Sequence, residues 1–200
     1  MSVVTLVSGG IDSVLMAIMM KEESIQQFPL FIDYGQLCVK KEWSACVALH
    51  QRHGLPKPVK MDLSGFGKVI ASGLTNKEKN VKNEAFLPGR NLLFLLAGSS
   101  YAFQHGSNVV AIGLLNEKVS FFPDQTSRFL EAAQKIISLT LGKEIKFLAP
   151  LMIFNKGDVI KLAKKRNIVG TYSCHAGGKE PCGRCISCLE ILNSKKRKGV

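Results

Sequence analysis

The chain has 200 residues, of which 46% are hydrophobic and 21% charged, and its formal net charge is +12 at pH 7. This length suits one folded domain with a small appendage, and the composition excludes a collagen-like, low-complexity or largely disordered chain. No apolar run approaches the ~20 residues that cross a bilayer, and the N-terminal apolar segment is too short for a signal peptide, so we expect a cytoplasmic protein without a membrane partner.

Strand and helix patterns alternate through the first third of the chain. Residues 3–7 form an apolar, largely β-branched run that is typical of a strand buried on both faces, and residues 12–23 have the apolar spacing of a helix. The next predicted elements are a strand over 28–35, a helix over 40–54 and a strand over 57–63. This alternation predicts an α/β fold, a Rossmann-like parallel sheet with helices on both faces.

A polar, glycine-containing stretch over residues 64–91 is longer than an ordinary connection, and we interpret it as an active-site loop. The elements predicted after it are a helix over 91–106, a strand over 108–114, a helix over 124–142 that Asp124 or Thr126 could cap, and a helix over 155–167. After residue 170 the chain becomes rich in Cys and Gly. We therefore divide it into a main domain, 1–170, and a cysteine segment with a basic tail, 171–200.

The turn between the first strand and the first helix has the residue types of an anion-binding loop. A glycine-rich turn at this place leaves backbone N–H groups unpaired at the positive end of the helix dipole. Hydroxyl groups add donors, and the aspartate could cap the helix or act through Mg²⁺. The nucleotide-binding residues predicted here are Ser8, Gly9, Gly10, Asp12 and Ser13. The alternative is a tight turn with a capped helix and no ligand.

Four cysteines in the last thirty residues have the spacing of a metal site. Cys174, Cys182, Cys185 and Cys188 form the pattern C-x7-C-x2-C-x2-C, which suits a structural zinc ion with four thiolate ligands. An iron–sulfur cluster is the alternative. His175 lies beside the first cysteine and is expected not to be a ligand, because four thiolates complete the site. We expect the two remaining cysteines, 38 and 46, to be buried core thiols.

Several short motifs carry a resemblance to known proteins. "SGGIDS" resembles the loop of the PP-loop ATP pyrophosphatase superfamily, whose members cleave ATP between the α and β phosphates. Together with the cysteine segment "YSCHAGGKEPCGRCISC", it resembles QueC, the family of 7-cyano-7-deazaguanine synthases. Further family landmarks in the same order are "FIDYGQ", "GLT", "LPGRNLLFL", "FPDQ" and "APLMIFNKGDVIKL".

The resemblance implies an ATP-dependent, AMP-forming ligase with structural Zn²⁺ and with Mg²⁺ beside ATP. In this family ATP adenylates the carboxylate of 7-carboxy-7-deazaguanine, ammonia displaces AMP, and a second ATP-dependent step converts the amide into the nitrile. By position, Asp12, Arg90 and Lys156 are the expected catalytic residues, Lys156 also binding nucleotide, and Arg90, Asn91 and Asp124 are expected to contact substrate. The family also implies a homodimer, and nucleic acid is not required.

One segment, "GLLNEKVSFFPDQT", departs from the family pattern and keeps other functions open. Gly113, Ser120, Pro123 and Asp124 match the family, whereas Leu115, Lys118, Phe121 and Thr126 replace its Asn, Asp, Gly and Arg. A lysine in place of an acid reverses local charge, so substrate handling could differ. One alternative is a QueC-like ligase that joins the deazaguanine carboxylate to a peptide or protein amine in antiviral defence. Another is a non-catalytic, zinc-containing module that binds nucleic acid through its positive charge.

Overall fold

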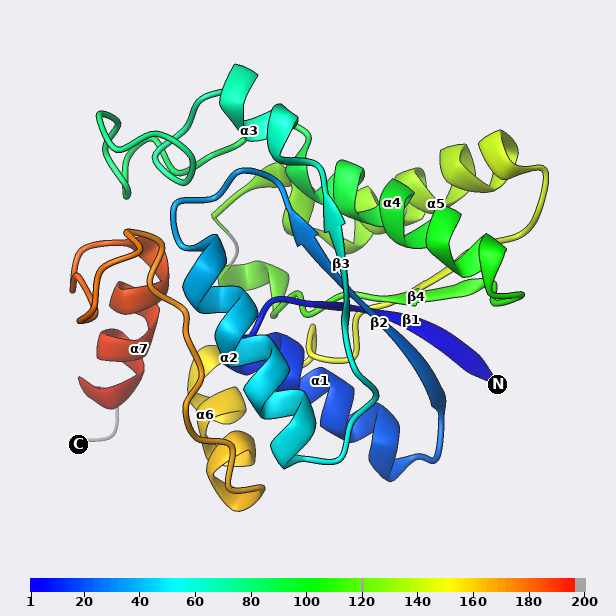
Figure 1. Cartoon of the computed structure of the whole chain (residues 1–200), viewed down its shortest axis with the longest axis horizontal. Helices are drawn as coiled ribbons and strands as arrows, with labels where there is room; N and C mark the ends of the chain where they lie inside the picture. The colour runs from blue at the N-terminus through cyan, green and yellow to red at the C-terminus, as the bar shows by residue number, and fades with distance from the viewer. Residues whose placement is uncertain (120, 197–200) are drawn as a thin grey trace.

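The computed structural model describes residues 1–119 and 121–196, so Ser120 and the end of the basic tail lie outside the described part. Its centre is a sheet of five strands in the order β3-β2-β1-β4-β5, with every neighbouring pair parallel. The strands are β1 (Ser2–Val7), β2 (Gln26–Asp33), β3 (Val59–Asp62), β4 (Val109–Ala111) and β5 (Lys146–Leu148). The predicted α/β fold with a parallel sheet is thereby confirmed (Figure 1).

Helices cover both faces of the sheet, α1, α2 and α6 on one side and α4 and α5 on the other (Figure 1). The helices are α1 (Ile11–Glu22), α2 (Val39–Arg52), α3 (Ser64–Val69), α4 (Arg90–Gln104), α5 (Ser127–Leu141), α6 (Lys156–Lys165) and α7 (Ile186–Lys196), with short 3-10 turns η1 (Glu117–Val119) and η2 (Pro123–Gln125). Thr126, one of the two caps considered, begins α5: the Phe129 N–H donates to its hydroxyl at 3.2 Å.

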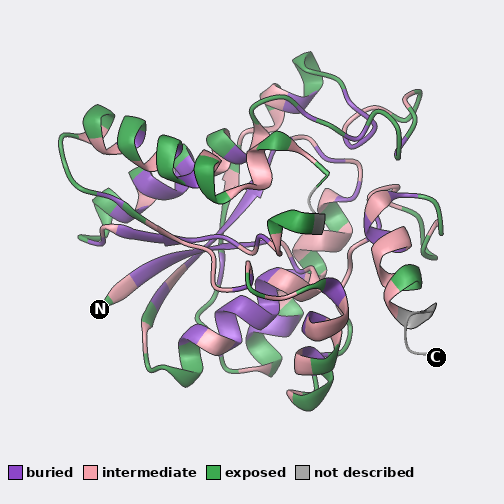
Figure 2. Cartoon of the chain, turned by 180° about the vertical axis from the view of Figure 1, so that it is seen from behind, coloured by how far each residue is buried: buried purple, intermediate pink, exposed green. Residues whose placement is uncertain are grey.

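The core is two apolar layers, one on each face of the sheet (Figure 2). Adjacent residues on β1 show the division, because Val3 packs toward α1 and α6 while Val4 packs toward α4 and α5, and both side chains are fully buried. Side chains alternate between the faces of a strand, so a central strand covered on both sides must be apolar at nearly every position. This explains the continuous apolar run that marked the strand in the sequence.

Two elements have no clear sequence signal. β5 is only three residues long and none of them is fully buried, so its sequence lacks the apolar run that identified the central strands. α7 begins within the cysteine segment and packs against α6, so residues treated as a tail in the sequence are partly helical. Helix formation there depends on tertiary contacts, because the apolar residues of α7 do not collect on one face.

The stretch interpreted as an active-site loop packs against both the main core and the cysteine segment, with Leu74, Ala85 and Leu87 buried in the apolar layer beside α4 and α5. It contains α3 and a series of turns, and Val81 is buried against Cys174, Cys185 and Cys188. Arg90 and Asn91 at its end line the cavity described below, and Leu74 and Ala85 line the hollow that adjoins it. Its length is therefore explained in part by a structural role.

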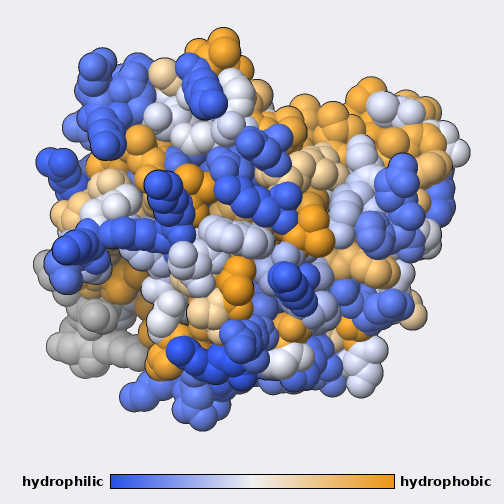
Figure 3. Space-filling view, viewed as in Figure 1, coloured by the Kyte–Doolittle hydropathy of each residue, from blue (hydrophilic) through white to orange (hydrophobic). Residues whose placement is uncertain are grey.

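The surface is mixed in character. Apolar side chains are exposed on α4 and α5, among them Leu96, Phe103, Ile136 and Leu139, and Figure 3 shows apolar surface over the part of the molecule where these helices lie. No helix in residues 1–119 and 121–196 has the length and apolar character that a bilayer-spanning segment requires.

Candidate active site

The glycine-rich turn lies where β1 ends, at the point where the strand order reverses. β2 and β4 flank β1, and the chain crosses to opposite faces to reach them. In open parallel sheets this place forms a crevice beyond the carboxyl ends of the strands, and ligands bind there. Gly9 turns the chain with a φ of +76°, and a Cβ on it would meet the Cys46 N–H nitrogen at 2.7 Å. The turn therefore needs glycine both for its conformation and for its contact with α2.

The hydroxyl groups of Ser8 and Ser13 form hydrogen bonds within the turn and fix its conformation. The Ser8 N–H donates to the Ser13 hydroxyl at 3.1 Å, and that hydroxyl lies 3.1 Å from the Gly10 carbonyl, to which it can donate. The Gly10 N–H in turn donates to the Ser8 hydroxyl at 3.3 Å. Gly10 is the N-cap residue of α1, and no side chain caps this helix. Asp12 therefore does not serve as the cap that the sequence allowed, and its carboxylate is available for another contact.

That contact is an ion pair with Lys156, the first residue of α6. The ammonium lies 2.9 and 2.6 Å from the two Asp12 carboxylate oxygens, and the lysine is 8% exposed. Glu190 of α7 adds a carboxylate oxygen 3.8 Å from the same ammonium. Burial raises the pKa of Glu190, and Lys156 opposes that rise. One buried lysine thus joins the glycine-rich turn, α6 and α7.

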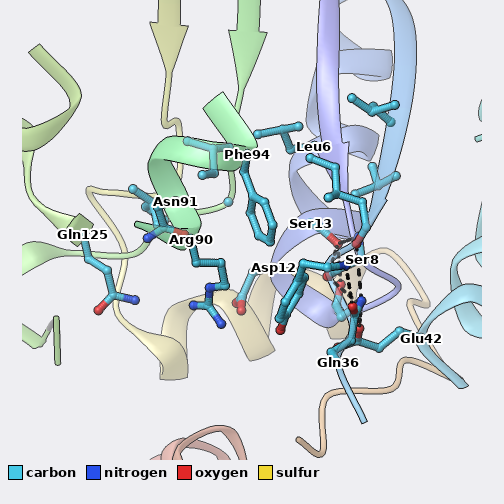
Figure 4. A pocket seen from close by; sticks show the side chains of 18 of the residues that line it. Leu6, Ser8, Asp12, Ser13, Gln36, Glu42, Arg90, Asn91, Phe94 and Gln125 are labelled. Carbon is cyan, nitrogen blue, oxygen red and sulfur yellow. Dashed lines mark hydrogen bonds between the residues drawn. The ribbon is translucent and has the colours of Figure 1, made fainter. Parts of the chain in front are cut away.

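A cavity of about 250 Å³ opens beside the loop, with apolar strand ends as its floor. Figure 4 shows Arg90, Asn91 and Phe94 of α4 on one side and the serines of the loop on the other. The Arg90 guanidinium lies 5.7 Å from the centre of the Tyr34 ring and 5.9 Å from that of Phe94. Aromatic faces hold a guanidinium while leaving its N–H groups free for an anion.

The predicted site residues do not all line this cavity. Those that do are Ser8, Gly10, Asp12, Ser13, Arg90 and Asn91. Gly9 lies on the side of the turn that packs against α2. Lys156 lines an adjoining hollow of about 150 Å³, and Asp12 and Arg90 line both this hollow and the cavity. Asp124 is not among the lining residues. Its carbonyl accepts a hydrogen bond from the buried Asn91 amide at 2.8 Å, and its neighbour Gln125 reaches the cavity instead.

Other residues join the cavity without having been identified as site residues. Tyr34 and Gln36 follow the end of β2, and the rule that strand ends meet at one edge could have identified them. Glu42 of α2 lines the cavity and Glu190 of α7 lines the adjoining hollow, but a carboxylate inside a helix gives no such signal. His175 lines the cavity, as its expected non-ligand role allows.

His175 is held neutral in this setting. Burial, together with the positive charges of Arg90 and Lys156, lowers the pKa of His175 to about 4. Its Nδ1 atom is buried without a hydrogen-bond partner in the described part of the chain. The cavity wall therefore presents an uncharged imidazole rather than another cation.

The four cysteines of the C-terminal segment form a cluster that fits a metal ion. Their sulfur atoms all lie within 4.8 Å of one another, close to the ~3.8 Å that a tetrahedral ion with 2.3 Å metal–sulfur bonds would impose. Backbone N–H groups approach the sulfurs, for example that of Cys185 at 3.3 Å from Cys182 Sγ. Burial would raise the pKa of Cys182, but hydrogen bonds from the backbone of Arg184 and Cys185 hold it at about 7. Such donors favour the thiolate that a metal requires. Both cysteines outside the cluster are buried, as expected.

The cysteine segment is hydrogen-bonded to the glycine-rich turn and to α2. The Tyr172 N–H donates to the Gly9 carbonyl at 3.0 Å, and the Lys41 ammonium of α2 donates to the Gly178 carbonyl. With Glu190 beside Lys156, the cysteine segment forms one wall of the site.

A parallel sheet with a glycine- and serine-rich turn at its switch point is an α/β fold of the PP-loop type. Solved structures agree on the fold. The U34-tRNA thiolase NcsA from Methanococcus maripaludis, solved with its [4Fe-4S] cluster, superposes with a TM-score of 0.61 at 17% identity, over 99% of this chain and 65% of that one. The NMN synthetase from Francisella tularensis gives 0.57 at 14% identity, over 99% and 76%.

Sequence comparison identifies the family within this class. The family model described as "Queuosine biosynthesis protein QueC" matches residues 2–196. The 7-cyano-7-deazaguanine synthase of Prochlorococcus marinus (strain MIT 9215) is 33% identical over 204 residues, covering 94% of this chain and 90% of the relative. That of Campylobacter concisus (strain 13826) is 28% identical over 206 residues, covering 97% and 93%. The chain belongs to the QueC family.

Proposed function

We propose that this protein is an ATP-dependent, AMP-forming ligase that converts 7-carboxy-7-deazaguanine into 7-cyano-7-deazaguanine. A substrate carboxylate oxygen attacks the α-phosphorus of ATP and pyrophosphate leaves. Ammonia then attacks the carbonyl carbon of the adenylate, the C–N bond forms, and AMP departs. In a second ATP-dependent step the amide oxygen attacks the α-phosphorus of another ATP, pyrophosphate leaves, and the nitrile forms as AMP departs with that oxygen and the nitrogen loses its two protons. The observation that carries this proposal is the convergence of the serine–glycine turn, the Asp12–Lys156 pair and Arg90 around one cavity and the hollow that adjoins it.

Each of these groups has a physical task in the proposed reaction. The turn supplies backbone and hydroxyl donors for phosphate oxygens. Arg90, with its guanidinium against two aromatic rings, and Lys156, with its ammonium buried beside the loop, neutralise charge on the α-phosphate and the departing pyrophosphate. Holding the carboxylate and the α-phosphorus in one cavity supplies orientation, which is the other main contribution a protein makes to such a transfer.

Two metals accompany the proposed reaction. Asp12 is the carboxylate of the loop that would hold Mg²⁺, an ion that protein sites commonly bind through one or two carboxylates plus substrate phosphates. The four cysteines would hold Zn²⁺ with no open position, which makes its role structural. Zinc is favoured over an iron–sulfur cluster because four sulfurs so close together fit a single tetrahedral ion.

A protein or peptide amine is a second acceptor that one observation favours. Two hollows, of about 150 and 110 Å³, lie beside Asp12 and are both lined by Phe121, Gln125 and Glu190. Phe121 is 59% exposed and stands where the family has glycine. An amine-bearing chain could approach the adenylate by this route.

The homodimer expected from the resemblance stays a prediction, to be checked by light scattering.

The test combines the protein with ATP, Mg²⁺ and 7-carboxy-7-deazaguanine, with and without ammonium, and measures AMP and product masses. We expect AMP and the nitrile with ammonium present. Replacing the buried lysine, Lys156→Met, should lower the rate of AMP formation by about 100-fold, as loss of one transition-state donor does. Lys161→Met on the exposed side of the same helix is the matched control and should leave the rate unchanged.

The products separate the candidate functions. AMP with a stable adenylate or amide, and a conjugate on addition of a peptide amine, would favour the second acceptor. Absence of AMP from the wild-type protein, together with salt-sensitive binding to DNA or RNA, would favour the nucleic-acid-binding module.

A further inference from the structure

Glu42 is a carboxylate in the cavity that phosphate chemistry does not require. It lies in the first turn of α2, and its side chain lines the cavity beside Gln36 (Figure 4). The Gln36 amide donates to Glu42 Oε2 at 3.0 Å. Gln36 is 3% exposed and is itself fixed, because its oxygen accepts from the Tyr34 N–H at 2.9 Å. A buried amide thus holds the carboxylate in one orientation.

Burial disfavours the charged form of Glu42, and the protein groups around it offset that cost in part. Burial raises the pKa of Glu42, while hydrogen bonds from Gln36 and Cys38 and the charge of Arg90 oppose the rise. A negative group in this wall would repel a triphosphate, and the phosphate donors are at the serine–glycine turn. An acceptor-only group among apolar and aromatic side chains instead suits a flat ligand that presents N–H donors.

The chemistry of the ligand follows from the acceptor. A carboxylate accepts two parallel hydrogen bonds from neighbouring N–H groups, which a guanine-type edge offers as N1–H and the 2-amino group. An adenine-type edge offers an acceptor at N1, which would oppose the carboxylate. Tyr34 and Phe94, whose ring centres are 5.3 Å apart, supply aromatic wall for a planar base.

We propose that Glu42 is a specificity-determining residue that accepts hydrogen bonds from the N1–H and 2-amino groups of the deazaguanine base. This inference rests on the proposed function for the identity of the base. It assigns the base to the wall formed by α2 and the end of β2, with the substrate carboxylate directed toward Arg90 and the phosphate loop.

The test is a binding cycle with two ligands and two proteins. Calorimetry measures the affinity of 7-carboxy-7-deazaguanine and of the same compound without its 2-amino group, for the wild type and for Glu42→Gln, with a non-hydrolysable ATP analogue measured separately. We expect the wild type to prefer the 2-amino ligand by about 100-fold, because one charge-assisted hydrogen bond is lost and a buried acceptor is left unpaired. Glu42→Gln should bind both ligands with similarly weak affinity and bind the ATP analogue as the wild type does. Glu131→Gln on the exposed side of α5 is the control.

The outcomes separate this inference from the proposed function. The inference is overturned if the Glu42→Gln variant still prefers the 2-amino ligand, or if that variant loses only its affinity for the ATP analogue. It is also overturned if the wild-type protein binds neither of the two base ligands. Discrimination that depends on Glu42 in a protein that forms no AMP supports the inference and rejects the proposed reaction. Circular dichroism and a melting curve show whether each variant is folded before binding is measured.

Discussion

Gly9 is the residue on which the shape of the phosphate loop depends most directly. Its φ of +76° is unfavourable for any side chain, and the space beside it is filled by the backbone of α2. Backbone atoms cannot turn aside as the end of a flexible side chain can. Two separate costs therefore apply at this position, one conformational and one steric.

A pair of alanine substitutions separates these costs. Gly106 has a φ of +66°, but nothing lies within 4 Å of where its Cβ would be. Gly106→Ala should lower the free energy of unfolding by ~1–2 kcal/mol, the cost of left-handed backbone alone. Gly9→Ala should cost a further ~1–3 kcal/mol because the loop or α2 must move. Urea unfolding measures both, and equal losses would show that the close contact with α2 is relieved without strain.

Gly9→Ala should also weaken binding of ATP, whereas Gly106→Ala should not, because Gly106 follows α4 far from the loop in sequence and lines none of the cavity.

The residue scale also shows what sequence can reveal. The loop could be predicted because its glycines and serines are required at fixed spacing along one turn. Glu42 could not, because its importance depends on a cavity built from residues on β1, β2 and α4.

At the scale of elements, α6 illustrates how a helix start positions a functional side chain. Asn155 caps the helix: its Oδ1 accepts from the Asp158 N–H at 3.1 Å, and the Asp158 carboxylate accepts from the Asn155 N–H at 3.3 Å. Lys156 is the first residue after this cap, so the cap determines where its side chain leaves the backbone.

Removal of the cap should therefore affect both stability and the proposed activity. Asn155→Ala should lower the free energy of unfolding by ~1 kcal/mol and slow AMP formation, because the first turn of α6 frays and Lys156 is less well placed. Asn155→Ser should restore much of both, since serine is also a good cap. Loss of stability in Asn155→Ala without any loss of rate would show that the ion pair with Asp12 alone positions the lysine.

Most elements of the sheet and its covering helices could be predicted from the sequence because burial on both faces imposes continuous apolar runs and helical spacing. The exceptions follow from the same physics. β5 is at the edge of the sheet and short, so it needs no such run. α7 gains its stability from α6 and from the cysteine cluster, so its own sequence need not be amphipathic.

At the scale of the molecule, the site is assembled from four distant parts of the chain. The loop comes from the first 13 residues, Arg90 and Lys156 come from two helices of opposite layers, and Glu190 comes from the cysteine segment. The segment reaches the loop through the hydrogen bond from Tyr172 to Gly9. A metal that holds this segment in place would therefore influence the site without contacting substrate or nucleotide.

Metal removal tests this connection. We expect one zinc ion per chain by elemental analysis, retained in Cys38→Ala and lost in Cys185→Ala, because only the second thiol belongs to the cluster. The metal-free protein should keep its sheet by circular dichroism, since the two apolar layers do not include the cluster. Its amides between 172 and 190 should lose protection from hydrogen exchange, and the ATP analogue should bind about 10-fold more weakly, equivalent to one lost hydrogen bond. Iron with acid-labile sulfide in place of zinc would identify a cluster instead. Unchanged exchange in the metal-free protein would show that packing alone holds the segment against the loop, and that the metal has no part in organising the site.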